Sequence, residues 1–320
     1  MATLKMGVDI GNFNSKTAHT EMVSGFKIFL TKPDLSKEYI EKDGKFYVLT
    51  SERFKYKQDK TENEHAEILT LFGIAKEILF RINRGKELTR EEQQQSIDKI
   101  SAINLGVGLP PMHCNRQAAK TKEYYENRLK NIEFNYKGFH FDFTTKNVFV
   151  FPQGYAAIQA SKKCKYITYP KFYVIDIGGY TVDVITMVNG SPDLSLVDSK
   201  PLGVLKLFQN IKSEVLRLEG FSLDDFIIES VILGKPHTLP ERVVNFIKAN
   251  VSQWANTIIN ELRESGIEFL AYPCVFVGGG SLVFRDDFDS SSEIGEHEYI
   301  TDTHANAIGY ERLLSVVLSE

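Results

Sequence analysis

The chain has 320 residues, which is more than one hydrophobic core usually serves, and 42% of them are hydrophobic. We therefore expect a folded protein of two domains and not a disordered chain. The formal net charge is −4, and the basic residues are spread among acidic ones. This distribution argues against direct binding to nucleic acid, which needs clustered Lys and Arg to neutralise phosphates.

Cysteine usage and hydropathy indicate where the protein works. Cys114, Cys164 and Cys274 lie far apart in the chain and form no CxxC pair. The N-terminus lacks the apolar stretch of a secretory signal, and no segment approaches the roughly 18 apolar residues that would cross a bilayer. We therefore expect a soluble, cytoplasmic protein without a membrane role.

The first half of the chain combines strands with one strongly periodic helix. Apolar residues recur at three- and four-residue spacing between 68 and 82, which predicts a helix. The polar run 93–98 is interpreted as a loop. Strands are expected at 6–10, 15–22, several places in 25–50, 100–109, 132–143 and 147–151, and further helices at 117–129 and 154–160.

The second half alternates strands and helices in the same way. Strands are expected at 172–177, 181–188 and 272–277, and helices at 204–218, 222–228, 239–262 and 306–318. Strand clusters that are each followed by helices are typical of α/β units and not of a helix bundle or a β-sandwich.

An internal repeat is the strongest signal in the sequence. Residues 8–16 and 175–183 match at an offset of 167, with Asp, Ile and Gly coinciding at Asp9 to Gly11 and Asp176 to Gly178. Copies half a chain apart indicate two domains of like topology and not a solenoid, whose periods are roughly 20 to 50 residues. Two equivalent β-hairpins facing one cleft are the expected geometry.

The residue types in these hairpins suit phosphate chemistry. A glycine lets the chain turn tightly, so that backbone N–H groups can point at an anion. A carboxylate would repel phosphate directly, but it accepts hydrogen bonds from the waters around Mg²⁺. Lys16 adds a mobile positive charge for a phosphate. A single Asp-x-Gly after a strand is most often only a turn; the repetition favours the phosphate interpretation.

These residues resemble the actin, Hsp70 and hexokinase ATPase superfamily, whose five sequence elements all have candidates here in order. The candidates are the two phosphate hairpins at 9–16 and 176–183, the first connecting element at 151–157, the adenosine element at 277–281 and the second connecting element at 306–310.

Within that superfamily the chain is most similar to the bacterial plasmid-segregation actins, the ParM or StbA group. The likeness rests on length, on the pattern Asp-x-Gly-Gly-x-Thr-x-Asp at the second hairpin, and on Pro201 to Val204 ahead of a helix. It is weak in 27–60 and 284–299, where outer subdomains of that group carry much of the filament contact.

The resemblance implies an actin-like, ribonuclease H-like α/β fold of two duplicated βββαβα-type domains around a nucleotide cleft. Domain I would comprise 1–155 plus 306–320, with a small outer subdomain IB at about 26–62, and domain II would comprise 156–305.

The resemblance also assigns candidate catalytic residues. Gln153 stands where the family places the residue that orients the attacking water, although many segregation actins carry Glu there and a helix-start Gln in solvent is the alternative. Asp9 and Asp176 are expected near Mg²⁺, bound through water in both cases, and Asp176 could instead act as a base. Asp183 could contact the site or only support strand pairing.

The nucleotide-binding candidates come from three of the elements. The glycine triplet would let a nucleotide approach the backbone while the next helix presents its positive N-terminus, the alternative being a flexible loop. Asn306 and Gly309 are expected to serve helix packing. The candidates are Gly11, Asn12, Asn14, Lys16, Gly178, Gly179, Tyr180, Thr181, Gly278, Gly279, Gly280 and Ser281.

The implied function is a magnesium-dependent ATPase, or GTPase, that forms polar helical filaments and segregates plasmid DNA through a DNA-bound, ParR-like adaptor. A small-molecule kinase of the same superfold is an alternative, although no convincing base motif is present. A chaperone would need a substrate-binding domain, for which 306–320 leaves no room. A non-hydrolysing structural relative is the remaining alternative.

Overall fold

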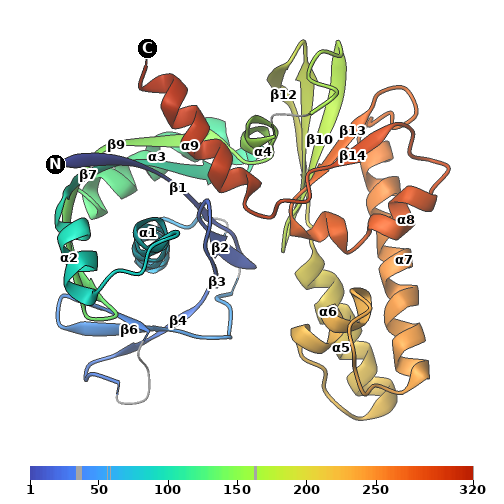
Figure 1. Cartoon of the computed structure of the whole chain (residues 1–320). Coiled ribbons are helices and arrows are strands. Elements are labelled where there is room, and N and C mark those ends of the chain that lie inside the picture. Colours follow the sequence, from blue (N-terminus) through green and yellow to red (C-terminus); the bar gives the residue numbers. More distant parts are fainter. Residues whose placement is uncertain (34–37, 56, 58, 162–163, 320) are drawn as a thin grey trace. The chain divides into compact units, whose positions relative to one another are not determined.

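The computed structural model describes residues 1–33, 38–55, 57, 59–161 and 164–319. The chain divides into two compact units (Figure 1). Unit 1 consists of Met1–Lys162 and His304–Glu320, and unit 2 of Lys163–Thr303. The domain boundaries expected from the sequence, 155/156 and 305/306, lie a few residues from these limits.

The strands of unit 1 form one mixed sheet in the order β3-β2-β1-β7-β9-β8-β5-β6-β4. The segment 26–62, predicted as an outer subdomain, supplies β4, β5 and β6, which join the sheet through β8; residues 34–37, 56 and 58 of it lie outside the described residues. The bounds are β1 Ala2–Ile10, β2 Asn14–Lys16, β3 Glu21–Val23, β4 Phe26–Phe29, β5 Tyr39–Lys42, β6 Lys45–Leu49, β7 Ile100–Leu109, β8 Asn131–Tyr136 and β9 Phe139–Pro152.

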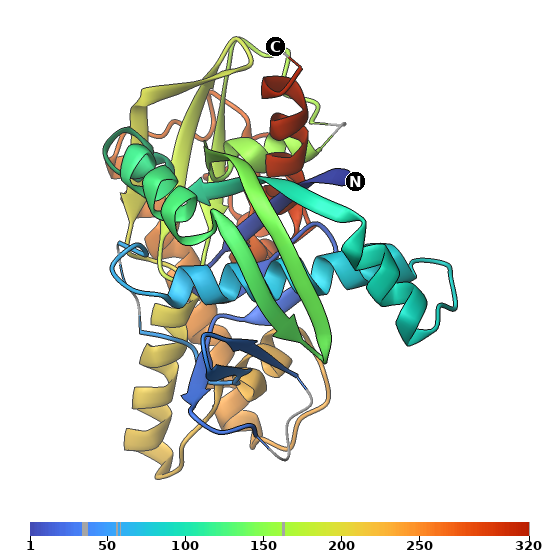
Figure 2. The same ribbon diagram turned by 90° about the vertical axis from the view of Figure 1, so that its left-hand side faces the viewer.

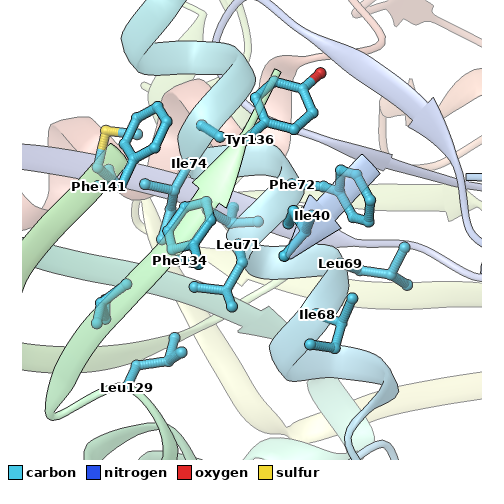
Figure 3. Packing of buried hydrophobic residues seen from close by; sticks show 14 of the residues in the cluster. Ile40, Ile68, Leu69, Leu71, Phe72, Ile74, Leu129, Phe134, Tyr136 and Phe141 are labelled. Carbon is cyan, nitrogen blue, oxygen red and sulfur yellow. The ribbon is translucent and has the colours of Figure 1, made fainter. Parts of the chain in front are cut away.

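Helix α1 (His65–Asn83) forms the core of unit 1. The sheet curls around it, so that strands surround the helix in Figure 1 and cross over its length in Figure 2. Its side chains from Ala66 to Ala75 are buried on every face, as expected for a helix without a polar stripe. Phe72 packs edge-on against Tyr136, and Phe134 stacks on Phe141 beside them (Figure 3).

The loop prediction in unit 1 is wrong. Residues 93–98, expected as a loop, belong to helix α2 (Arg90–Asp98). The helix starts at a capping box, because the Thr89 hydroxyl accepts from the Glu92 backbone N–H and the Glu92 carboxylate accepts from the Thr89 N–H. The cap explains a helix that buries little besides Ile97. Helix α3 (Pro111–Arg128) also begins earlier than expected, at a proline in its first turn.

Helix α9 (Ala305–Val317) approaches its neighbours very closely. A Cβ at Gly309 would lie 1.8 Å from the Ala156 carbonyl oxygen on α4 (Tyr155–Ala160), and one at Gly7 on β1 would lie 2.0 Å from the Ala307 carbonyl oxygen. The Asn306 side chain accepts a hydrogen bond from the Gly154 N–H at 2.9 Å. The expected packing role of Asn306 and Gly309 is confirmed.

Unit 2 is a sheet in the order β12-β11-β10-β13-β14 with helices packed beside it (Figure 1). Strands β12 and β14 were not predicted. Strand β12 is polar and lies at the sheet edge, and its residues do not alternate between buried and exposed. The bounds are β10 Lys171–Ile177, β11 Val182–Val188, β12 Ser191–Lys200, α5 Val204–Glu219, α6 Asp225–Ile232, α7 Glu241–Glu264, β13 Cys274–Val277, α8 Arg285–Ser290 and β14 His297–Tyr299.

The predicted α/β class is confirmed, since both units combine a mixed sheet with helices. Cys114, Cys164 and Cys274 are free, buried thiols. In the part of the chain that the structure describes, no helix has the length and apolar character needed to cross a membrane.

The close approach of α9 can be tested with one added methyl group. Gly309→Ala should lower the free energy of unfolding by about 3 kcal/mol, because the Cβ meets backbone that cannot rotate away. The control Val316→Ala changes an exposed side chain of the same helix and should cost less than about 0.5 kcal/mol. Urea unfolding followed by circular dichroism measures both; equal stability of Gly309→Ala and the native chain would contradict the packing.

Candidate functional site

The first hairpin brings Asp9 to the end of a buried strand. Strands β1 and β2 pair in antiparallel fashion, with Asp9 opposite Lys16 and Ile10 opposite Ser15. The turn between them needs glycine at position 11, since a Cβ there would lie 2.4 Å from the Asn14 carbonyl oxygen. Asp9 is only 9% exposed.

Gln153 lies against this carboxylate. Its Nε2 donates to Asp9 Oδ1 at 2.7 Å, and its backbone N–H donates to the Leu109 carbonyl at 2.9 Å. The next residue, Gly154, has φ of 72°, a left-handed conformation that turns the chain from β9 into α4. The structure therefore brings together two of the three predicted catalytic residues, and it leaves the Gln153 Oε1 as an acceptor for water.

Asn14 and Lys16, both predicted to bind nucleotide, lie on β2 and contact Glu21 on β3. The Asn14 amide donates to the Glu21 carboxylate, and Lys16 Nζ lies 4.0 Å from it. The Asn14 Oδ1 is buried and has no hydrogen-bond partner among the described residues. This acceptor is suited to a water or to a cation's hydration shell.

The second hairpin repeats the arrangement in unit 2. Strands β10 and β11 pair with Asp176 opposite Asp183, and the Gly178 N–H donates to the Thr181 carbonyl at 2.9 Å to close the turn. The Thr181 hydroxyl donates to Asp183 Oδ2 at 2.8 Å. Asp176 and Asp183 are 8% and 5% exposed, so this turn holds two buried acidic residues.

The N-terminus of α5 packs onto this second turn. The Val204 and Leu205 N–H groups donate to the carbonyls of Gly178 and Gly179 at 3.2 and 2.8 Å. A Cβ at Gly203 would lie 2.4 Å from the Tyr180 backbone, which requires glycine there. The hairpin is thus fixed by a helix terminus that would otherwise have unsatisfied amides.

The glycine triplet borders the same carboxylate. A Cβ at Gly278, whose φ is 82°, would lie 2.4 Å from Asp176 Oδ1, and one at Gly280 would lie 2.6 Å from Ile177. The Ser281 hydroxyl donates to the Gly278 carbonyl at 2.7 Å. Gly279 alone is exposed. The triplet leads into a 3₁₀ turn (Gly279–Leu282), and the next helix, α8, is short.

Comparison with known proteins identifies this architecture. The family described as archaeal actin homologue MreB-like, C-terminal, matches residues 174–290, which lie in unit 2. The archaeal actin homologue Ta0583 superposes with a TM-score of 0.75 at 18% identity, covering 98% of this chain and 99% of that chain. The chain has the actin-like fold.

Two filament structures share the fold. A 15-stranded ParM filament from Clostridium botulinum gives a TM-score of 0.71 at 15% identity, covering 99% of this chain and all of that one. An AlfA filament bound to AMPPNP gives 0.62 at 16% identity, covering 99% and 98%. Ta0583 has also been solved in complex with ADP. No curated protein sequence matches the chain. The predicted likeness to ParM is confirmed at the level of fold.

The donor set of the actin-like hairpins fits hydrated magnesium. Mg²⁺ keeps several waters and is usually held through one or two carboxylates, so a cage of protein ligands is not required. Among the described residues, no group of three acidic, His or Cys side chains forms such a cage. Asp9 and Asp176 each offer a buried carboxylate beside a glycine turn. Their roles as metal-binding residues remain predictions.

Sequence reasoning missed the residues of α1 that support the first hairpin through the residues that follow β2. Glu77 on α1 is fully buried and accepts from the Thr17 hydroxyl at 2.5 Å, the His19 N–H at 3.0 Å and Arg81 Nε at 2.7 Å. His19 Nδ1 lies 2.6 Å from the same carboxylate. Arg81 continues to Glu311 on α9. The signal that could have revealed this network is Glu77 itself, an acidic residue next to Ile78 in a helix that is otherwise largely apolar.

A second supporting residue is Trp254 on α7. It is half-buried, and its Nε1 donates to the Leu202 carbonyl at 2.9 Å, one residue ahead of Gly203. Trp254 therefore fixes the segment that packs on the second hairpin. No sequence pattern linked α7 to this segment, because the contact spans about fifty residues.

Glu77→Gln tests whether the buried network stabilises unit 1. Burial raises the Glu77 pKa, but hydrogen bonds from Thr17, His19 and Arg81 outweigh burial and lower it below its usual 4.5. The carboxylate therefore contributes stability above pH 4.5, and that contribution is lost as the pH falls further. The variant should lose about 3 kcal/mol at pH 7, because Arg81 loses its buried partner.

Chemical denaturation at several pH values measures this effect, with Glu87→Gln as the control on an exposed residue. The difference between native chain and Glu77→Gln should narrow as the pH is lowered below 4.5. A variant as stable as the native chain at pH 7 would contradict the structural role of Glu77.

Proposed function

We propose that the chain is a magnesium-dependent nucleoside triphosphatase that uses ATP or GTP and assembles into polar filaments. One observation carries the proposal: each unit presents a buried carboxylate at the end of a strand, in a glycine-turned hairpin of the same register. A single such turn has structural explanations. Its repetition in two units of one actin-like fold favours phosphate binding as the role of each hairpin.

In unit 1, Asp9 would hold a hydrated magnesium by accepting hydrogen bonds from its waters, and Lys16 on the opposite strand would supply positive charge for a phosphate. Gln153 orients the attacking water. Its Nε2 is engaged by Asp9, so the amide plane is fixed and Oε1 is directed by that bond. A fixed acceptor lowers the entropy cost of placing the water in line with the γ-phosphorus.

In unit 2, Asp176 has the corresponding role and lies over Gly278. The exposed backbone of Gly279 lets the nucleoside approach without a side chain in the way. Gly178 to Thr181 form the phosphate turn, supported by α5. Magnesium held there through water would offset the negative charge of the phosphates, which is the chemistry it would supply to a hydrolysis site.

Filament formation is proposed from the fold neighbours. ParM and AlfA, which share the fold, have been solved as filaments, and AlfA carries AMPPNP there. Contacts between different faces of identical subunits generate filaments when the rotation does not close. By extension we propose that the filaments act in the cytoplasm, moving plasmid DNA through a DNA-bound adaptor. A net charge of −4 is consistent with an adaptor and not with direct DNA contact.

A kinase of the same fold is the second candidate, and one experiment separates the two. The purified chain is mixed with ATP and magnesium, and phosphate release, light scattering and electron micrographs are recorded. Polymer together with released phosphate supports the proposal. ADP production that requires an added sugar supports a kinase, and polymer without released phosphate supports a non-hydrolysing filament protein.

Asp176→Asn should slow phosphate release roughly 100-fold or more, because the amide keeps the contact with Gly278 but loses the charge that holds metal-bound water. The control Asp193→Asn removes an acidic residue of β12 in the same unit, which bonds only locally to Ser195, and should leave turnover within about twofold. Undiminished release by Asp176→Asn would remove this residue from the mechanism.

Gln153→Ala should lower kcat about 100-fold with little change in KM, because water orientation matters in the transition state and not in binding. Filaments of this variant should outlast those of the native chain, since hydrolysis destabilises the lattice. Phosphate release and light-scattering decay test the two effects together. Normal disassembly with normal release would contradict the role of Gln153.

A further inference from the structure

Helix α4 lies against α9 in unit 1 (Figure 1), and it begins two residues after Gln153. With six residues, α4 is shorter than the roughly 12 residues that an isolated helix needs to be even marginally stable in water. Its position is therefore set by what packs against it. Helix α9 comes so close at Gly309 that a Cβ there would lie 1.8 Å from the Ala156 carbonyl oxygen.

Helix α9 also forms hydrogen bonds at both ends of α4. At the start, Asn306 Oδ1 accepts from the Gly154 N–H at 2.9 Å. At the end, Arg312 Nη1 donates to the Gln159 carbonyl at 2.9 Å and to the Ala160 carbonyl. Carbonyls in the last turn of a helix have no partner within the helix. Both ends of the short helix are thus held by the same neighbour.

The hydrogen bond to Asn306 fixes the backbone of Gln153. The Gly154 N–H belongs to the peptide unit that follows Gln153, and the carbonyl of that unit accepts from the Tyr155 N–H at 2.8 Å. The peptide unit that precedes Gln153 donates its N–H to the Leu109 carbonyl on β7 at 2.9 Å. Because each peptide unit is planar, holding both units sets the direction of the Gln153 Cα–Cβ bond.

The turn at Gly154 depends strongly on this one acceptor. Gly154 is buried, and a buried N–H that loses its acceptor is costly, so the chain would shift toward another partner. Glycine resists such a shift weakly, because it has no Cβ to restrict its backbone angles. The contact of Gln153 Nε2 with Asp9 restrains only the far end of the side chain. Loss of the Asn306 oxygen should therefore let the Gln153 backbone move.

We propose that Asn306 is a positioning residue, which sets the orientation of the Gln153 side chain through the Gly154 N–H. Its effect on hydrolysis rests on the proposed function, whereas its effect on the Gln153 side chain does not. A displacement of about 1 Å at a reacting site can cost roughly 100-fold in rate. Only part of that loss is expected without the Asn306 oxygen, because the contact with Asp9 still guides the amide.

Steady-state hydrolysis of ATP by the full chain tests the consequence for catalysis. Asn306→Ala should lower kcat about tenfold and leave KM within about twofold, because the nucleotide-binding candidates are unchanged. Asn306→Asp keeps an oxygen acceptor at the same place and should recover kcat to within about threefold of the native chain. Asn306→Ser, whose hydroxyl lies closer to its own backbone, takes the place of Asn306→Ala if that variant does not fold.

The matched control is Arg312→Ala, which removes the contact of α9 with the far end of α4. It should lower the denaturation midpoint as Asn306→Ala does, but it should leave kcat within about twofold. An equal fall of kcat in both variants would mean that loosening α4 at either end impairs hydrolysis. That result would overturn the specific role of Asn306.

Nuclear magnetic resonance without nucleotide tests the positioning directly. The side-chain amide signals of Gln153 are assigned in isotope-labelled protein by their loss in Gln153→Glu. They should shift toward those of a free glutamine amide in Asn306→Ala and stay in place in Arg312→Ala. Signals that do not move in Asn306→Ala, or a native kcat in that variant, overturn the proposal. If the signals move but the native chain hydrolyses no nucleotide, the proposed function fails and the positioning of Gln153 stands.

Discussion

In each unit, one carboxylate is buried at the end of a strand, and the residues around it are arranged to satisfy this constraint. Asp9 and Asp176 are almost completely shielded from water. A buried charge is costly unless donors or a cation compensate it. In unit 1 the Gln153 amide supplies a donor. In unit 2 the carboxylate lies over a residue that must be glycine, because a Cβ at Gly278 would lie 2.4 Å from Asp176 Oδ1.

The two hairpins are alike in register but differ in what supports them. The first hairpin is supported by an ion-pair and hydrogen-bond network on α1 that includes Glu77 and Arg81. The second is held by the amides of the first turn of α5, with Trp254 fixing the approach of that segment. The duplicated motif has therefore kept its register while the packing that supports it differs between the two units.

The likeness to other actin-like structures follows the same division. Identity to Ta0583 is 18%, yet the superposition covers nearly all of both chains. Volume and pattern in a core tolerate extensive substitution, whereas a tight turn beside a charge does not. The segment 27–60 is one of the two in which the sequence resembles the segregation actins least. Chemistry particular to this chain is expected in that segment.

The sequence by itself determined the α/β class, the long helix α1 and the two hairpins, because strong periodicity and glycine turns are local properties that need no knowledge of distant contacts. The sequence also contains the capping box of α2, but this helix was not predicted because it lacks an apolar stripe. Only the tertiary structure decided that Gln153 meets Asp9 and that Glu77 supports the first hairpin. Those bonds join residues 144 and 60 positions apart, and no local propensity specifies which distant side chain fills a buried polar site.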